Sequence, residues 1–253
     1  MSQPRERSGT AMIAVETAGG PLLVPYEIRH SARARRIRLS LGPRNQALLH
    51  IPRRSSVQTA LDFLRSQGDW LEKQLRKAPP PLSLAAHLAA QPRLSGLGRE
   101  FSLMLNFTTA RPFLVFSEQS GEAEFRYPAG EGAEAALRIL LCEFARKVIP
   151  PRIHELASRH GLRIRRVSVR DQGSRWGSCS GRGTLSLNWR LVLLPVELHD
   201  YVLLHELAHL TEMNHSDSFW KLLRAYDPRV EAHDRELTRV SRTLMRLGRA
   251  GTF

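Results

Sequence analysis

Residues 195–210 read PVELHDYVLLHELAHL, and this stretch decides both the fold and the chemistry that the sequence predicts. Pro195 suits the first turn of a helix, where its fixed φ fits and its missing amide hydrogen costs nothing. The residues after it are apolar nearly all round, which indicates a buried helix. On that helix His205 and His209 are four residues apart and project from one face. They can therefore present two imidazoles to one metal ion.

Glu206 is expected to be the general base beside this pair. Its side chain is rotated by about 100° around the helix axis from that of His205. It therefore does not share the helix face of the two histidines but can reach the water bound to the ion. Zinc binds neutral imidazole, takes three protein ligands in catalytic sites and lowers the pKa of its water to about 7. The alternative is a chance match to HExxH. A buried helix disfavours that alternative, because ionisable groups there need partners.

Two residues compete for the third ligand position. Glu212 follows His205 by seven residues and shares its stripe if the helix continues. His215 follows by ten residues, about 15 Å along an unbroken helix, so it reaches the ion only if the helix ends first. A break near Asn214 is expected, and Ser216 can then cap the next helix. Because HExxHxxxxxH is the spacing of known three-histidine zinc sites, we favour His215.

The rest of this half of the chain indicates an α+β domain over residues 131–253. Pro150-Pro151 should kink or restart its first helix, and Gly161 should cap the continuation. The order is helix, small mixed sheet, HExxH helix and closing helices. Periodicity predicts these elements: helices over 133–148, 216–225 and 229–247, and strands over 166–170 and 184–191.

The first half predicts a smaller β-rich domain with one helix over residues 21–130, preceded by a flexible segment 1–20. Apolar and polar residues alternate over 36–41, which is typical of a strand whose wet face carries Arg36 and Arg38. Residues 47–51 are expected to be its hairpin partner, and 56–76 the helix. The glycine-rich segment 127–132 suggests the domain boundary.

The sequence predicts a cytoplasmic protein. Its two cysteines do not suggest a disulfide framework, and no run approaches a secretory signal or the roughly 18 apolar residues of a membrane span. The net charge of +14 and pI near 11.1 attract polyanions. Nucleic acid, nucleotides, anionic lipid and acidic proteins are all candidates, and charge alone does not choose among them. Weak electrostatic binding of nucleic acid is one hypothesis, and a merely solvated basic surface is the alternative.

Four motifs resemble the YgjP-like family of metal-dependent hydrolases in their order and spacing. The resemblance covers roughly residues 134–245, with a weaker match in YEIRHSARARRIRL at 26–39. The motifs are RWGSCS at 175–180, LNWRLVLLP at 187–195, DYVLLHELAHL at 200–210 and NHSDSFW at 214–220.

This family is similar to the SprT-like proteins and is usually labelled metallopeptidase. The resemblance implies a zincin-like C-terminal domain, zinc on His205, His209 and His215, and a catalytic Glu206. One departure separates the chain from the metzincins: they have glycine where this chain has Glu212, and no convincing Met-turn follows. Metzincin rules of substrate binding should not be transferred.

Five further residues are candidates for supporting roles. Arg175 could bind a substrate carboxylate or phosphate, and Gly177 should allow a conformation that a side chain would forbid. Cys179 is expected to be a small buried residue, with a ligand or redox role as the alternative. Asn188 is either a substrate contact or an ordinary solvated residue. Tyr201 could stabilise an oxyanion or be a buried hydrogen-bonded tyrosine.

Three functions compete on this basis. The first is a zinc peptidase acting on peptides or proteins. The second is a phosphoanhydride hydrolase, such as a nucleoside triphosphate pyrophosphatase, because the same site with nearby arginines suits phosphoryl chemistry. The third is a nucleic-acid-associated SprT-like protease guided by Arg36 and Arg38.

Overall fold

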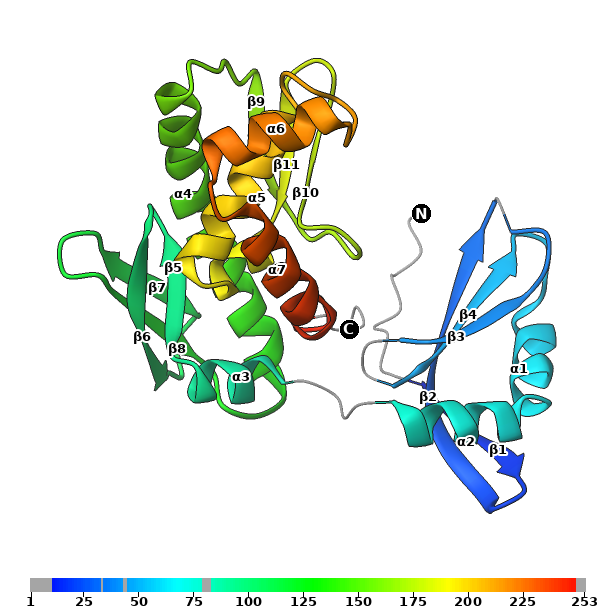
Figure 1. The fold of residues 1–253 in the computed structure, drawn as a ribbon. Helices are drawn as coiled ribbons and strands as arrows, with labels where there is room; N and C mark the ends of the chain where they lie inside the picture. The colour runs from blue at the N-terminus through cyan, green and yellow to red at the C-terminus, as the bar shows by residue number, and fades with distance from the viewer. Residues whose placement is uncertain (1–10, 33, 43–44, 79–82, 249–253) are drawn as a thin grey trace, which may run out of the picture. The chain divides into compact units, whose positions relative to one another are not determined.

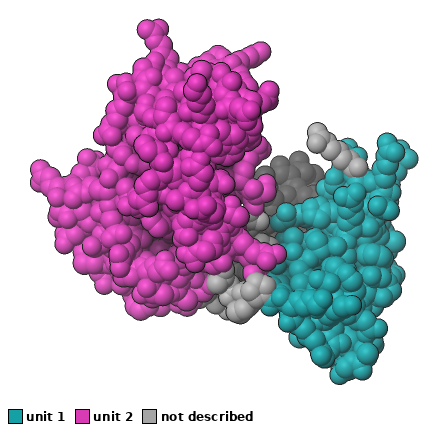
Figure 2. Space-filling model, in the orientation of Figure 1, with its two compact units in different colours: residues 1–82, 249–253 teal, residues 83–248 magenta. Residues whose placement is uncertain are grey.

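The computed structural model describes residues 11–32, 34–42, 45–78 and 83–248. The chain divides into two compact units, residues 1–82 with 249–253 and residues 83–248 (Figure 2). The sequence placed this division between residues 130 and 131. It falls earlier because the strands over 93–127 pack on the first long helix of the second unit.

The first unit is a four-stranded sheet with two helices packed on one face. Its strand order is β1-β2-β4-β3, with β2 and β4 parallel and the other pairs antiparallel. The antiparallel pairing of β3 with β4 confirms the expected hairpin partner. The elements are β1 (Ala11–Thr17), β2 (Gly20–Ser31), β3 (Arg38–Leu41), β4 (Ala47–Pro52), α1 (Val57–Arg65) and α2 (Gly68–Lys77).

Two expectations for this unit were wrong. Residues 11–17 are a strand and not part of a flexible segment, because Ile13 and Val15 are buried in the core; residues 1–10 lie outside the described residues. The helix expected over 56–76 is two helices with a break at Ser66 and Gln67. Gly68 opens the second one against β1, where an added Cβ would lie 1.8 Å from the Glu16 carbonyl oxygen.

The second unit begins with a four-stranded sheet that packs on a long helix. The strand order is β5-β6-β8-β7, and the rings of Phe101, Phe125 and Phe144 join sheet and helix, with centroids 5.4 and 6.4 Å from Phe144. The elements are α3 (Leu84–Ala90), β5 (Arg93–Gly96), β6 (Arg99–Phe107), β7 (Phe113–Ser117), β8 (Glu122–Tyr127), the 3₁₀ turn η1 (Gly130–Gly132) and α4 (Ala133–Arg159).

The sequence predicted a kink or a second start at Pro150 and Pro151, and the structure excludes the second start, because α4 runs through the pair as one helix. Interior prolines cost a helix hydrogen bonds, but Val148, Ile149 and Ile153 are fully buried on both sides of the pair. Tertiary packing therefore holds the helix together. Gly161 follows its end with φ +66°, as a C-terminal cap requires.

The remaining elements surround the HExxH helix, α5 (Figure 1). A three-stranded sheet has the order β10-β11-β9, with β9 and β11 parallel and β10 antiparallel. The strand expected over 184–191 ends at Asn188, and a 3₁₀ turn continues it. The elements are β9 (Arg166–Arg170), β10 (Gly177–Cys179), β11 (Thr184–Asn188), η2 (Trp189–Leu193), α5 (Val196–Ala208), α6 (Asp217–Tyr226) and α7 (Val230–Leu244).

The described residues thus form a mixed α and β structure of seven α-helices and several small sheets, consistent with the α+β class. None of these helices is long and apolar enough to cross a membrane.

Candidate metal centre

The third histidine is brought to the first two by the end of α5. The helix stops at Ala208, earlier than the break expected near Asn214, and His209 is its C-cap. Seven residues later Ser216 starts α6, where its side chain accepts a hydrogen bond from the Phe219 amide. His215 belongs to the short connection between the two helices, and so it can face back toward α5.

The three imidazoles converge on one point. The ring nitrogens of His205, His209 and His215 that could bind a metal all lie within 4.8 Å of one another. The Nε2 atoms of His205 and His215 are 3.1 Å apart. Two ligands of a tetrahedral zinc ion with bonds of about 2.05 Å are about 3.3 Å apart, which is close to this distance. Glu212 is not part of the cluster. The donor set fits a metal that prefers imidazole.

Neighbouring groups orient the rings. His209 Nδ1 lies 2.9 Å from the Glu212 carbonyl oxygen. Because a carbonyl can only accept, Nδ1 carries the proton and Nε2 is left with its lone pair. The buried Phe219 ring stacks on His209 at a centroid distance of 4.6 Å and meets His205 edge-on at 5.0 Å. Glu212 thus contributes its backbone to the site.

The electrostatics favour neutral histidines. Burial, and then the neighbouring His209 and His215, lower the pKa of His205 to about 4. Burial also lowers the pKa of His209, opposed by its bond to the Glu212 backbone. Both rings are therefore uncharged near neutral pH, which is the form that binds a metal.

Glu206 lies next to this cluster in a nearly closed environment. Its residue is 6% exposed, and its Oε2 has no hydrogen-bond partner among the described residues. Burial raises the pKa of the carboxyl group to about 7, while the charge of Arg175 acts in the opposite direction. A carboxylate with this pKa can accept and return a proton near neutral pH.

Gly177 makes room for that carboxylate. A Cβ at Gly177 would lie 2.5 Å from Glu206 Oε1 and 2.6 Å from Glu206 Cγ. The sequence expectation of an unusual backbone conformation was wrong, because Gly177 is an ordinary strand residue of β10. Its role is to let the strand approach the helix. No local signal could have shown this, since the two segments are far apart in sequence.

Arg175 and Cys179 flank the same carboxylate. Arg175 is exposed and acts on Glu206 through its charge. Cys179 is half-buried, and burial together with the Glu206 charge raises the pKa of its thiol to about 11. The thiol is therefore neutral, and the metal-binding cluster among the described residues consists of the three histidines without it.

Asn188 is neither a substrate contact nor a solvated residue, the two roles that the sequence suggested. It is fully buried, and its Nδ2 donates to the carbonyl oxygens of Gln172 and Arg175 at 2.9 and 3.0 Å. Its Oδ1 accepts from the Arg190 amide at 3.1 Å. The side chain fastens the loop before β10 and has no exposed surface to offer a substrate.

Tyr201 is the buried hydrogen-bonded tyrosine that was one of the two expected readings. It is 2% exposed, and its hydroxyl donates to Asp234 Oδ1 at 3.0 Å. Its ring lies between His205 and His233, with centroid distances of 6.2 and 5.9 Å. Burial and the charge of Asp234 raise its pKa.

A small cavity beside His209 was missed in the sequence. It has a volume of about 360 Å³ and is lined by Arg163, Arg165 and Arg182 together with His209 and Met213. The three arginines are exposed and form no ion pair with a described carboxylate. The only signal in the sequence is the high density of arginines around β9, and this density does not show which way their side chains point.

Comparisons with known proteins identify the family of the chain. A family model described as "YgjP-like, metallopeptidase domain" matches residues 35–240. A similar solved structure is the crystal structure of the metallopeptidase zymogen of Pyrococcus abyssi abylysin; it is 28% identical, and the match covers 35% of this chain and 91% of that chain, with a TM-score of 0.32. No curated protein matches the chain.

Proposed function

Because the chain belongs to the YgjP-like family of metallopeptidase domains, we propose that it is a zinc-dependent peptidase with His205, His209 and His215 as the metal ligands. The observation that carries the proposal is the convergence of three imidazoles next to one buried carboxylate. Three neutral nitrogen ligands are the usual set of a catalytic zinc site, and they leave a coordination position for the reaction.

Zinc at this position would supply Lewis-acid chemistry, polarising a peptide carbonyl and making water more acidic. The protein's own contribution is proton transfer. Glu206 accepts the proton of the attacking water and delivers it to the leaving amine. Its raised pKa of about 7 suits both steps. Gly177 supports this role because its lack of a side chain keeps the carboxylate in place.

The organisation around α5 supports a zincin-like catalytic domain. The active helix packs beside a small mixed sheet, β10-β11-β9, and is followed by the closing helices α6 and α7. We propose that this domain corresponds to residues 83–248, the second compact unit. The α4 helix and the β5–β8 sheet are then part of the catalytic domain.

A phosphoanhydride hydrolase is the second candidate, and one observation favours it. The cavity beside His209 carries Arg163, Arg165 and Arg182, whose charges are not neutralised by described carboxylates. Arginine forks bind phosphate oxygens in a bidentate manner. In a peptidase the same cavity would receive an acidic side chain of the substrate.

One experiment separates the two candidates. Zinc-loaded protein is incubated with a peptide library and, in parallel, with a panel of nucleoside triphosphates, and Glu206→Gln serves as the control in both. We expect peptide cleavage that depends on Glu206, with a preference for acidic residues near the cleaved bond. Nucleotide hydrolysis without peptide cleavage would replace the peptidase by the second candidate. If neither peptides nor nucleotides are hydrolysed, the proposal that the protein is a hydrolase is refuted.

A further inference from the structure

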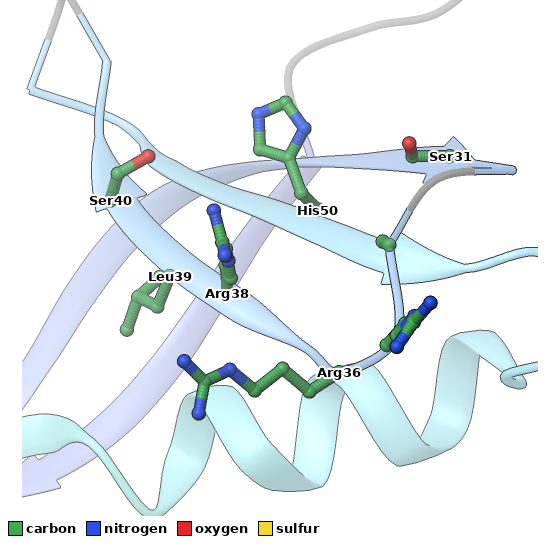
Figure 3. A pocket seen from close by; sticks show the side chains of 8 residues that line it. Ser31, Arg36, Arg38, Leu39, Ser40 and His50 are labelled. Atoms are coloured by element: carbon green, nitrogen blue, oxygen red, sulfur yellow. The ribbon is translucent and has the colours of Figure 1, made fainter.

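The first unit contains a basic cavity that the catalytic site does not use. Its volume is about 750 Å³, and it is lined by Ser31, Arg35, Arg36, Arg38, Ser40 and His50 together with Ala34 and Leu39. Figure 3 shows Arg38, Ser40 and His50 projecting to the same side of β3 and β4, whereas Leu39 points to the other side.

The strand register places basic side chains in a row. Arg38 of β3 lies opposite His50 of β4, and His50 lies opposite Arg29 of β2. Adjacent strands are about 4.8 Å apart, so the row spans about 10 Å. Leu49 and Ile51, the neighbours of His50 along β4, point the other way into the core with α1 and α2. The helices therefore leave the face of His50 open.

The charge of this face is not neutralised. Residues 11–82 contain twelve arginines and lysines against five acidic residues, so this small unit carries a large share of the net charge of +14. Among the described residues, Arg35, Arg36 and Arg38 form no ion pair with a carboxylate, while Arg29 pairs with Glu27 at 2.7 Å. Three exposed guanidinium groups around one cavity are available for an anion.

We propose that this cavity binds the phosphate backbone of single-stranded nucleic acid. Its donors, arginines with serine hydroxyls and a histidine, are the groups that contact phosphates in nucleic-acid complexes. Its volume falls in the range of about 300–1,000 Å³ that encloses small ligands, so it can hold one nucleotide of a strand. Guanidinium and imidazole planes can also stack on an unpaired base.

The shape favours a single strand over a duplex or a membrane. The basic groups of the cavity lie on a sheet, and the two described helices of the unit pack on the opposite face, so neither helix can carry these groups into a major groove. Surfaces that bind membranes combine basic with exposed apolar side chains. The large apolar residue of this cavity, Leu39, is only half-exposed and packs on the core.

The test measures binding of the full chain to labelled oligonucleotides by fluorescence anisotropy. The probes are single-stranded RNA, single-stranded DNA and duplex DNA of about 20 nucleotides, and the competitors are polyglutamate and phosphatidylserine vesicles. The variant is Arg36→Ala with Arg38→Ala. The matched control is Lys73→Ala with Lys77→Ala, which removes the same charge from exposed positions of α2.

Each phosphate contact contributes about −0.7 to the slope of log K against log salt for a single strand, which is about fivefold in affinity at about 0.1 M salt. The arginine variant should therefore bind both single strands about 25-fold more weakly, with a salt slope reduced by about 1.4. The lysine variant should stay within about threefold of wild type, because charges beyond about 10 Å are screened.

A second measurement locates the contact. Photo-crosslinking to RNA that contains 4-thiouridine should label residues 31–50 in wild type, and thermal unfolding checks that both variants are folded. Equal losses in the two double variants, crosslinks only outside residues 31–50, or no binding of single strands would overturn the proposal. So would tighter binding to duplex DNA, polyglutamate or vesicles than to single strands.

Discussion

The most specific consequence of the site geometry concerns Gly177, which touches Glu206 from the neighbouring strand. In Gly177→Ala the new Cβ would lie 2.5 Å from Glu206 Oε1. An ordinary close contact is about 3.4 Å, so the carboxylate has to retreat by about 0.9 Å. A misplacement of about 1 Å in a catalytic group can cost about 100-fold in rate. We therefore expect kcat to fall by about 100-fold.

The rest of the molecule should tolerate the change. The clash involves Cγ and Cδ of the buried Glu206 side chain as well as Oε1, and not backbone, so the free energy of unfolding should fall by about 1–3 kcal/mol. The three atoms nearest to the added Cβ all belong to Glu206 and none to a histidine, so metal content should remain at the wild-type level. The assay measures kcat for a cleaved peptide, metal content by mass spectrometry, and urea unfolding.

The matched control is Gly132→Ala, where an added Cβ meets nothing closer than 3.5 Å. It should leave kcat and metal content unchanged. A Gly177→Ala protein with full metal and wild-type kcat would refute the assignment of Glu206 and of the strand that positions it.

The remaining predictions address the ligands and the buried polar groups. Substituting His215 by Ala should remove most of the metal, whereas Glu212→Gln should retain it; the opposite result in metal analysis would make Glu212 the ligand. Burial raises the pKa of Glu206 from 4.5 to about 7, so the metal-free wild type is most stable below pH 4.5 and loses stability as the pH rises through 7. In urea unfolding of the metal-free proteins, the free energy of unfolding of Glu206→Gln should therefore increase by about 3 kcal/mol relative to wild type between pH 4 and pH 8. A difference that does not change with pH would contradict the raised pKa. Asn188→Ala removes the hydrogen bonds to the Gln172 and Arg175 carbonyl oxygens and should lower the free energy of unfolding by about 1–3 kcal/mol, so a neutral effect would argue against its loop-fastening role. Tyr201→Phe should lose about 1 kcal/mol of stability and keep kcat within about threefold, and a loss of kcat near 100-fold would instead support an oxyanion role.

The sequence predicted those features that depend on local spacing. The placement of His205 in the helix and of His209 at its C-cap, the end of that helix before His215 and the cap at Ser216 follow from helix periodicity and capping chemistry, although the helix ends six residues before the expected break near Asn214. The family resemblance was confirmed by the match over residues 35–240. The metal ligands themselves stay predictions.

The features that the sequence did not predict depend on tertiary contacts. The prolines of α4 suggested a kink or a restart, and the helix does not restart because burial of the residues around them holds it together. The roles of Gly177 and Asn188 depend on packing between segments distant in sequence. The position of the division between units was missed because the glycine-rich 127–132 connects elements that pack on each other, and glycine content alone cannot distinguish a loop within a domain from a linker.

The proposed hydrolysis depends most directly on Glu206 being the proton acceptor. The measurement is the turnover of a cleaved peptide by zinc-loaded wild type and Glu206→Gln, with metal content determined in the same samples. Glutamine keeps the shape of the side chain and removes its basicity, so the variant should hold wild-type zinc and lose about 100-fold or more in turnover. Undiminished turnover at full zinc content would contradict the proposed chemistry.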